Sequence, residues 1–181
     1  MKRRRFILHL LSIFILASCV THYFDRPIPV DVRNYNQMPK EIQGNWTSND
    51  GEDIVIDKTC WTLNSVDSTG EKQSTIEFII PDSLTVKRWR KSYYFNKLES
   101  NGYWTVYYGQ KEGEFFYIKG LGDDDTLAFK QILNLEPTRI EKTSRYYSAP
   151  LKKKQLKKFA SNGGFCDTLM VFDLKKRELT K

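Results

Sequence analysis

Histidine is nearly absent from this 181-residue sequence, in which its two copies are His9 and His22. Both precede the region where we expect regular secondary structure to begin. We therefore expect no Ser-His-Asp or Cys-His catalytic arrangement in the folded domain, and no zinc site built on imidazole. The sequence also lacks a glycine-rich phosphate loop and any serine followed three residues later by lysine.

Carboxylates are the groups that remain for catalysis, and Glu52, Asp53 and the run 123–125 are the nominal candidates. Acidic clusters of this kind are usually solvated turns. The run 123–125 also lacks the alternating ligand spacing and terminal glutamate of a calcium loop. The sequence therefore predicts a non-catalytic protein that carries no metal and no other cofactor.

Positive charge is concentrated rather than spread. The formal net charge is +7, and residues 2–5 contribute four of the positive charges. The rest of the chain is only mildly basic, so nucleic acid is not an expected partner. With 40% hydrophobic and 28% charged residues, the composition predicts one compact domain.

The longest apolar run covers residues 6–17, behind the cationic residues 2–5. As a helix these twelve residues would span roughly 18 Å, well short of the ~30 Å hydrocarbon core of a bilayer. The pattern therefore predicts a cleaved secretory signal and not a permanent membrane span.

The residues Leu16-Ala17-Ser18-Cys19 resemble the lipobox of bacterial lipoproteins. The resemblance implies a signal peptide over 1–18, cleavage before Cys19, and lipid on the Cys19 sulfur that anchors the protein to a membrane. Val20 stands where an aspartate would retain the protein in the inner membrane, so the resemblance implies the outer membrane, and we expect its periplasmic face. An ordinary signal peptide with a chance cysteine is the alternative interpretation.

Residues 19–40 are predicted to form a lipidated tether, because this segment carries Pro27, Pro29 and Pro39 and shows no sustained periodicity. Aromatic residues within the segment could instead pack on the domain. The folded β domain is expected over residues 41–181.

Short β-branched and aromatic runs separated by turn formers dominate the rest of the chain, which is typical of an antiparallel meander. We predict strands at 41–46, 53–56, 60–63, 74–80, 83–89, 92–97, 103–108, 114–119, 126–132, 138–146 and 167–173, and one helix at 149–161. Asn101-Gly102 is the clearest hairpin turn. So many strands must close on themselves or form two packed sheets.

Gly44-Asn45-Trp46 resembles the start of the first strand in lipocalin-like (calycin) β-barrels. The resemblance implies a mainly β fold, an antiparallel meander closing into a barrel, in which the indole closes the barrel floor. It also implies that Lys175, Lys176 or Arg177 packs across that indole. A tryptophan that simply anchors a core would explain Trp46 equally well.

Aromatic side chains are abundant and occur on both faces of the strands predicted at 103–108 and 114–119. One set could line an apolar cavity, so the candidate ligand-binding residues are Trp46, Trp104, Tyr108 and Phe116. Core filling is the alternative. The expected partner is a small apolar or amphipathic ligand, or alternatively the other proteins of an envelope complex in which this chain is a structural subunit.

Cys60 and Cys166 are the two thiols that remain once Cys19 carries lipid. A secreted location permits a disulfide, and closing this loop could contribute ~4–5 kcal/mol to stability. Two free buried cysteines are the equal alternative at this point.

Overall fold

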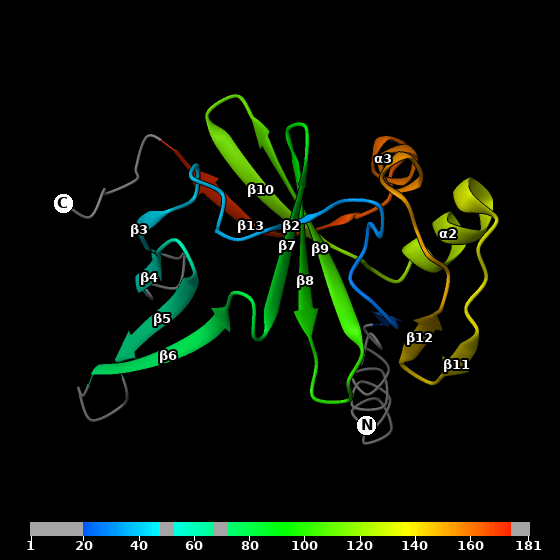
Figure 1. Cartoon of the computed structure of the whole chain (residues 1–181), viewed down its shortest axis with the longest axis horizontal. Coiled ribbons are helices and arrows are strands. Elements are labelled where there is room, and N and C mark those ends of the chain that lie inside the picture. Colours follow the sequence, from blue (N-terminus) through cyan, green and yellow to red (C-terminus); the bar gives the residue numbers. More distant parts are fainter. Residues whose placement is uncertain (1–19, 48–52, 67–71, 175–181) are drawn as a thin grey trace, which may run out of the picture.

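The computed structural model describes residues 20–47, 53–66 and 72–174, which form two β-sheets and two helices (Figure 1). The larger sheet contains β1 (Thr21–Phe24), β2 (Asn34–Tyr35), β7 (Leu84–Trp89), β8 (Ser92–Leu98), β9 (Trp104–Glu112), β10 (Phe115–Gly120), β11 (Arg139–Glu141), β12 (Ser144–Tyr147) and β13 (Asp167–Asp173). The smaller sheet contains β3 (Gly44–Thr47), β4 (Asp53–Ile56), β5 (Cys60–Val66) and β6 (Lys72–Ile79). The helices are α2 (Asp125–Leu133) and α3 (Lys153–Ser161).

The larger sheet runs in the order β11-β12-β1-β9-β8-β7-β2, and β10 and β13 extend it beside β9. Its pairs are antiparallel except for β1 and β12, which are parallel. Strand β9 uses one end to pair with β1 at Trp104 and the other end to pair with β10 from Tyr108 onward. Because β1 and β10 pair with different ends of β9, they begin two separate branches of the sheet.

The smaller sheet is a simple meander in which β3, β4, β5 and β6 pair in chain order. The mainly β, largely antiparallel prediction is confirmed. Neither sheet is closed in the described part of the chain, so the predicted lipocalin-like barrel is not confirmed. The meander ends after four strands, and the chain then returns to the larger sheet, which already contains β1 and β2.

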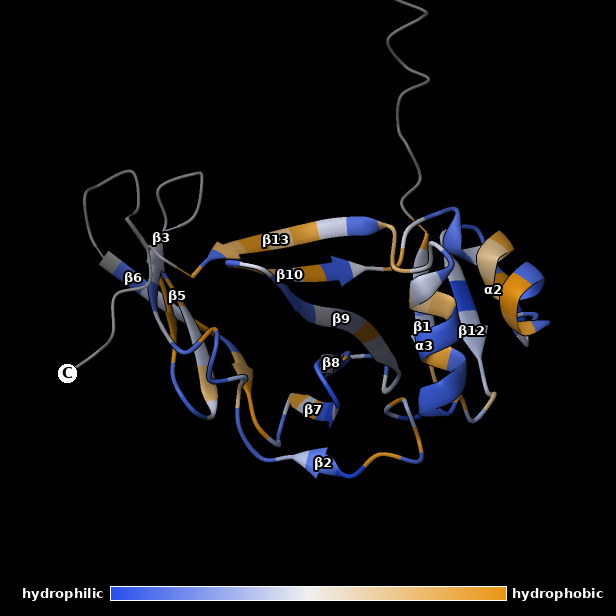
Figure 2. Cartoon of the chain, turned by 90° about the horizontal axis from the view of Figure 1, so that it is seen from above, coloured by the Kyte–Doolittle hydropathy of each residue, from blue (hydrophilic) through white to orange (hydrophobic). Residues whose placement is uncertain are grey.

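Two hydrophobic cores lie on opposite faces of the central strands β7, β8 and β9, with the smaller sheet on one side and the helices on the other (Figure 2). The sheet-side core consists of Met38, Ile42, Trp46, Ile54, Ile56, Trp61, Ile80, Leu84, Val86, Tyr93, Phe95, Phe116, Ile118 and Phe172. The helix-side core consists of Phe24, Ile28, Tyr94, Val106, Tyr108, Phe129, Tyr147, Leu151, Leu156, Phe159 and Phe165. Side chains alternate between the two faces of a strand, so a single strand such as β8 contributes residues to both cores.

Most predicted strands are present, and those at 53–56 and 167–173 have the predicted bounds. The Asn101-Gly102 turn joins β8 to β9, and Gly102 has the positive φ of 80° that such a turn requires. The strand predicted at 138–146 is instead the hairpin of β11 and β12. The predicted helix at 149–161 is α3, which begins four residues later.

The strand predicted at 126–132 is wrong, because this segment is the helix α2. Asp125 and Phe129 are its buried residues, four apart, and Ala128 and Ile132 also pack on the helix-side core. This is the spacing of one helical face, which outweighs the β-branched character of the segment.

The prediction of a tether is wrong for residues 20–40. Strand β1 lies between β12 and β9 in the larger sheet, and the backbone N–H of Val30 donates to the carbonyl of Leu151 at 2.9 Å. The ammonium group of Lys87 donates to the carbonyl of Val32 at 3.0 Å. Met38 is completely buried in the sheet-side core. The segment that contains these prolines is therefore ordered and packed on the domain, and it is not a flexible tether.

Within the described residues, α2 and α3 are both too short to cross a bilayer, and no other helix there is long and apolar enough to do so.

Candidate functional site

The four predicted ligand-binding residues do not form one site. Trp46 and Phe116 lie in the sheet-side core, whereas Tyr108 belongs to the helix-side core and Trp104 packs against it. Residues 104, 106 and 108 share the face of β9 that meets the helices, and the intervening residues face the smaller sheet. The prediction that these four side chains gather around one ligand is wrong, because strand alternation separates them.

Trp46 fixes the first strand of the smaller sheet to the last strand of the larger one. Its indole Nε1 donates to the carbonyl of Ile42 at 2.8 Å, and its ring meets Phe172 of β13 edge to face at 4.9 Å between ring centroids. The calycin resemblance implied that Lys175, Lys176 or Arg177 packs across this indole, and these three residues lie outside the described residues.

Tyr108 is held by hydrogen bonds rather than presented to a ligand. Its hydroxyl donates to the Gln110 side-chain oxygen at 2.5 Å and lies 3.0 Å from the Ser92 hydroxyl oxygen. Its ring stacks on Phe165 at 5.3 Å between centroids. Burial raises the pKa of the phenol above its usual value, so the group stays neutral. Tyr108 is therefore a structural residue of the helix-side core.

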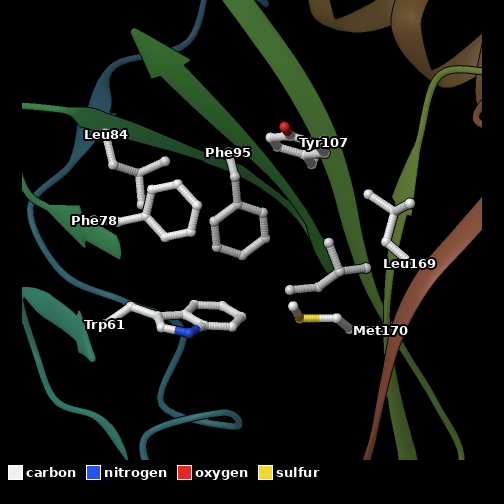
Figure 3. Close-up of a pocket in the computed structure, with 8 residues that line it drawn as sticks. Trp61, Phe78, Leu84, Phe95, Tyr107, Leu169 and Met170 are labelled. Carbon is white, nitrogen blue, oxygen red and sulfur yellow. The ribbon is translucent and has the colours of Figure 1, made fainter. Parts of the chain in front are cut away.

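A half-open apolar pocket of about 160 Å³ lies instead between the two sheets (Figure 3). Its lining consists of Trp61, Phe78, Leu84, Phe95, Tyr107, Ile118, Leu169 and Met170. Trp61 and Phe78 come from the smaller sheet, and the other six come from five strands of the larger sheet. The volume is similar to that of a cavity of ~150 Å³ that binds benzene in another protein.

A bulge in β13 shapes the mouth of this pocket. Ile118 pairs with Met170 and Lys119 pairs with Thr168, so Leu169 is an extra residue on β13. A bulge interrupts the alternation of side chains, and this explains why the consecutive residues Leu169 and Met170 both line the pocket. They are 52% and 39% exposed and form the rim.

Gly109 lies next to Phe95, one of the residues that line the same pocket. A Cβ atom at this position would lie 2.6 Å from the ring of Phe95 and 3.0 Å from that of Phe116. The missing side chain lets both rings approach the backbone of β9 closely. Phe95 is one of the residues that line the pocket.

The lining carries no charged side chain, and its heteroatoms are the Tyr107 hydroxyl oxygen, the Trp61 indole nitrogen and the Met170 sulfur. Such a wall suits an apolar group, because an ion or a strongly polar group would lose its hydration without gaining partners. A candidate ligand therefore inserts a small ring or a short aliphatic segment.

His22 is a buried residue of β1, so the expectation that the folded domain contains no histidine is wrong. Its Nε2 lies 3.0 Å from the Gly122 carbonyl oxygen, while Nδ1 is buried without a hydrogen-bond partner. The ring stacks on Tyr147 and is tilted against Phe129. Burial lowers the pKa of the imidazole, so the neutral form is favoured. The sequence did contain a signal for this burial: His22 and Phe24 are two residues apart in a short aromatic run, which is the spacing of one face of a strand.

Asp125 anchors the start of α2 and the chain before β13. Its carboxylate accepts hydrogen bonds from the backbone N–H groups of Gly122 at 2.8 Å and Phe165 at 3.1 Å, and from the Cys166 thiol at 3.3 Å. Burial, and then the charge of Asp125, raise the pKa of Cys166 to about 11. The thiol is therefore protonated at neutral pH and is a poor nucleophile.

Of the two alternatives for Cys60 and Cys166, the disulfide is absent and both thiols are free, although Cys60 is only half-buried and Cys166 is exposed. Cys60 begins β5 in the smaller sheet, whereas Cys166 lies beside Asp125 next to the helices. The smaller sheet, which contains β5, and the helices lie at opposite sides of the molecule (Figure 2). A disulfide requires the two Cα atoms to approach within about 7 Å.

Of the carboxylate candidates, Asp125 has this structural role, Asp53 accepts a long hydrogen bond of 3.4 Å from Thr47, and Glu52 lies outside the described residues. Over the ranges 20–47, 53–66 and 72–174, no group of three or more His, Cys, Asp or Glu side chains is arranged to hold a metal ion.

Comparisons of this chain with protein-family models, curated proteins and solved structures found no match. The resemblance to lipocalin-like barrels therefore depends on Gly44, Asn45 and Trp46 alone.

Proposed function

We propose that this chain is a bacterial envelope lipoprotein, anchored in the outer membrane through lipid on Cys19, whose domain binds a small apolar group without catalysis. The lipobox and the short apolar run before it support the anchor, Val20 after the cysteine supports the outer membrane, and the lack of acidic residues over 20–24 supports its periplasmic face. The pocket between the sheets supports the binding role. Binding here takes place between two open sheets and not inside a closed barrel.

The observation that carries the binding role is the composition of the pocket wall. Eight apolar or aromatic side chains from both sheets surround it, and its rim residues Leu169 and Met170 remain exposed. A core that served only packing would fill this space, because protein interiors have few voids larger than a water molecule.

The size of the pocket limits the affinity. A six-carbon group gains roughly 5 kcal/mol on burial at ~0.8 kcal/mol per methylene. Association costs several kcal/mol or more, so we expect a Kd of about a millimolar or weaker for an isolated small group. A natural ligand that binds more tightly must also contact the rim around Leu169 and Met170.

The methionines provide a direct test. The sequence contains Met1, Met38 and Met170, and Met1 is expected to be removed with the signal. A protein labelled with 13C at its methionine methyl groups should give one signal from the pocket rim and one from the buried Met38. Titration with benzene or hexanol should shift the Met170 signal and leave the Met38 signal in place.

A plugging variant makes the test specific. Leu169→Trp places a larger side chain at the exposed rim and should abolish the shift of the Met170 signal. Leu127→Trp is the matched control, because Leu127 is 58% exposed on α2 and does not line the pocket. A Met170 signal that stays constant in the unsubstituted protein at saturating benzene would overturn the binding role.

A structural role in an envelope complex is the second candidate function, and strand β13 favours it. In the described part of the chain β13 pairs only with β10, and Leu169, Met170 and Val171 are consecutive exposed residues on it. An edge of this kind can pair with a strand of another protein. Val171→Lys should release such a partner in co-purification, whereas it should leave benzene binding intact because Val171 does not line the pocket.

A further inference from the structure

The first described residue is already tied into the fold. The backbone N–H of Val20 donates to the Asp123 carboxylate at 2.7 Å, and that of Thr21 donates to the carbonyl of Thr143 at 2.9 Å. Adjacent Cα atoms are about 3.8 Å apart. A lipid on Cys19 therefore holds the surface around Val20 within one residue of the membrane.

Two exposed aliphatic side chains lie on either side of this point. Leu127 is in the first turn of α2, just after Asp123, and Ile140 is in β11, next to the turn that contains Thr143. They are 58% and 65% exposed, which makes them the two most exposed large hydrophobic residues in the described ranges. Exposed aliphatic groups beside an anchor are suited to insertion among lipid headgroups.

The register places Ile140 on the same side of the sheet as α2. Ile140 pairs with Arg145, Arg145 pairs with His22, and residues paired across a sheet point to the same face. The ring of His22 contacts Phe129 of α2. Leu127 and Ile140 therefore belong to one end of the molecule, where β1, β12 and α2 lie side by side (Figures 1 and 2).

The charges near this point are balanced and do not favour an anionic surface. Asp123, Asp124 and Glu141 are exposed acidic residues here, and the nearby basic ones are Lys142, Arg145 and Arg139, of which Arg139 forms an ion pair with Glu141 at 3.3 Å. Basic clusters are what attract anionic lipids. A zwitterionic surface fits better, because it neither repels the carboxylates nor requires a basic patch.

We propose that the surface formed by Val20, Asp123, Leu127, Ile140, Lys142 and Thr143, the anchor face, rests on zwitterionic lipid headgroups with Leu127 and Ile140 inserted among them. The inference rests on the proposed lipidation of Cys19. It is independent of the apolar pocket. The anchor face gives the domain a fixed orientation on the membrane, whereas a flexible tether would let it rotate freely.

The test uses the full chain, lipidated in a bacterial host and reconstituted in vesicles of phosphatidylethanolamine and phosphatidylcholine. In a background carrying Cys60→Ser and Cys166→Ser, one cysteine is placed by Leu127→Cys, Ile140→Cys or Ile76→Cys and labelled with an environment-sensitive fluorophore. Ile76 is the matched control at 57% exposure, on β6 of the smaller sheet. Circular dichroism verifies that each variant is folded.

We expect a blue-shifted and severalfold brighter emission at positions 127 and 140 on vesicle binding, with no change at position 76. A Gly-Ser linker of about ten residues between Cys19 and Val20 should reduce the signal while the protein still floats with the vesicles. Equal responses at all three positions in a floating protein would overturn the anchor face alone. A protein that does not float would overturn the anchor face and the lipidation together. A response that requires phosphatidylglycerol would overturn the zwitterionic assignment.

Discussion

The side-chain oxygen of Asn96 accepts a hydrogen bond from the backbone N–H of Ile28 at 2.7 Å, although the two residues are 68 positions apart. Asn96 is completely buried in β8, and its amide nitrogen donates weakly to the carbonyls of Thr85 and Tyr94 at 3.3 Å. This amide joins the N-terminal segment to the central strands.

We predict that Asn96→Leu destabilises the domain by about 1–3 kcal/mol, because it leaves the Ile28 N–H buried without an acceptor. Urea unfolding followed by tryptophan fluorescence measures the change. Asn101→Leu, in an exposed turn, is expected to cost less. Equal stability of Asn96→Leu and the unsubstituted protein would contradict the role of this bond.

The buried His22 should make stability depend on pH. Its folded pKa lies below the ordinary value of 6.5, so the unfolded chain binds the proton more readily. Stability from the neutral ring is present above pH 6.5, and it declines as the pH falls below that value toward the lowered folded pKa. Comparing urea midpoints at pH 7.5 and 5 should show a larger loss for the unsubstituted protein than for His22→Gln, which retains a donor for Gly122. An identical loss in the two proteins would show that other groups account for the acid sensitivity.

Asp125→Ala should be strongly destabilising, by about 2–5 kcal/mol, because the buried carboxylate accepts several hydrogen bonds that link α2 to the chain before β13. Asp124→Ala is the matched control, since Asp124 is exposed and its side chain makes no capping bond. Its expected effect is within about 0.5 kcal/mol. Thermal or urea unfolding of the two variants distinguishes them, and similar costs would argue against the anchoring role of Asp125.

Gly109→Ala should destabilise the domain by about 1–3 kcal/mol, because the new methyl group overlaps the buried rings of Phe95 and Phe116. Gly120→Ala is a useful comparison. Its methyl group would meet Leu169 at 2.9 Å, and Leu169 is half-exposed and free to move. We expect Gly120→Ala to cost less in urea unfolding. If the order is reversed, Gly109 does not limit the packing of Phe95 and Phe116 against β9.

The proposed lipidation is tested at the sulfur atom of Cys19. Cells grown with radiolabelled palmitate should label the protein, and Cys19→Ser should remove the label although Cys60 and Cys166 remain. Inhibition of the lipoprotein signal peptidase should accumulate a longer precursor. Labelling that persists in Cys19→Ser would place the lipid elsewhere.

Much of the strand pattern could be predicted because turn residues and β-branched runs act locally. Strand 53–56 and the Asn101-Gly102 hairpin are examples. The helix α2 was missed because its apolar residues are compatible with a strand as well as with a helix. The helix is favoured by the packing of Phe129 against Phe159 and Tyr147. Such contacts are set by tertiary packing, which no local window contains.

The site was harder to predict than the fold. Trp61, Phe78 and Tyr107 are ordinary strand residues in the sequence, and only the packing of the two sheets brings them to one pocket. The extra residue Leu169 on β13 arises from the pairing of β13 with β10. Trp46 was identified as a candidate ligand-binding residue, but its ring packs against Phe172 and anchors the sheet-side core instead.

The position of β1 also bears on the turnover of the anchored protein at the membrane. In a lipidated chain, Val20 would be the one residue between the acylated cysteine and β1, which pairs with β12 and, at Phe24, with β9. A protease would therefore have little chain to cut there without first separating β1 from its neighbours. The domain would therefore not be shed intact into the surrounding fluid, and its release would require destruction of the fold.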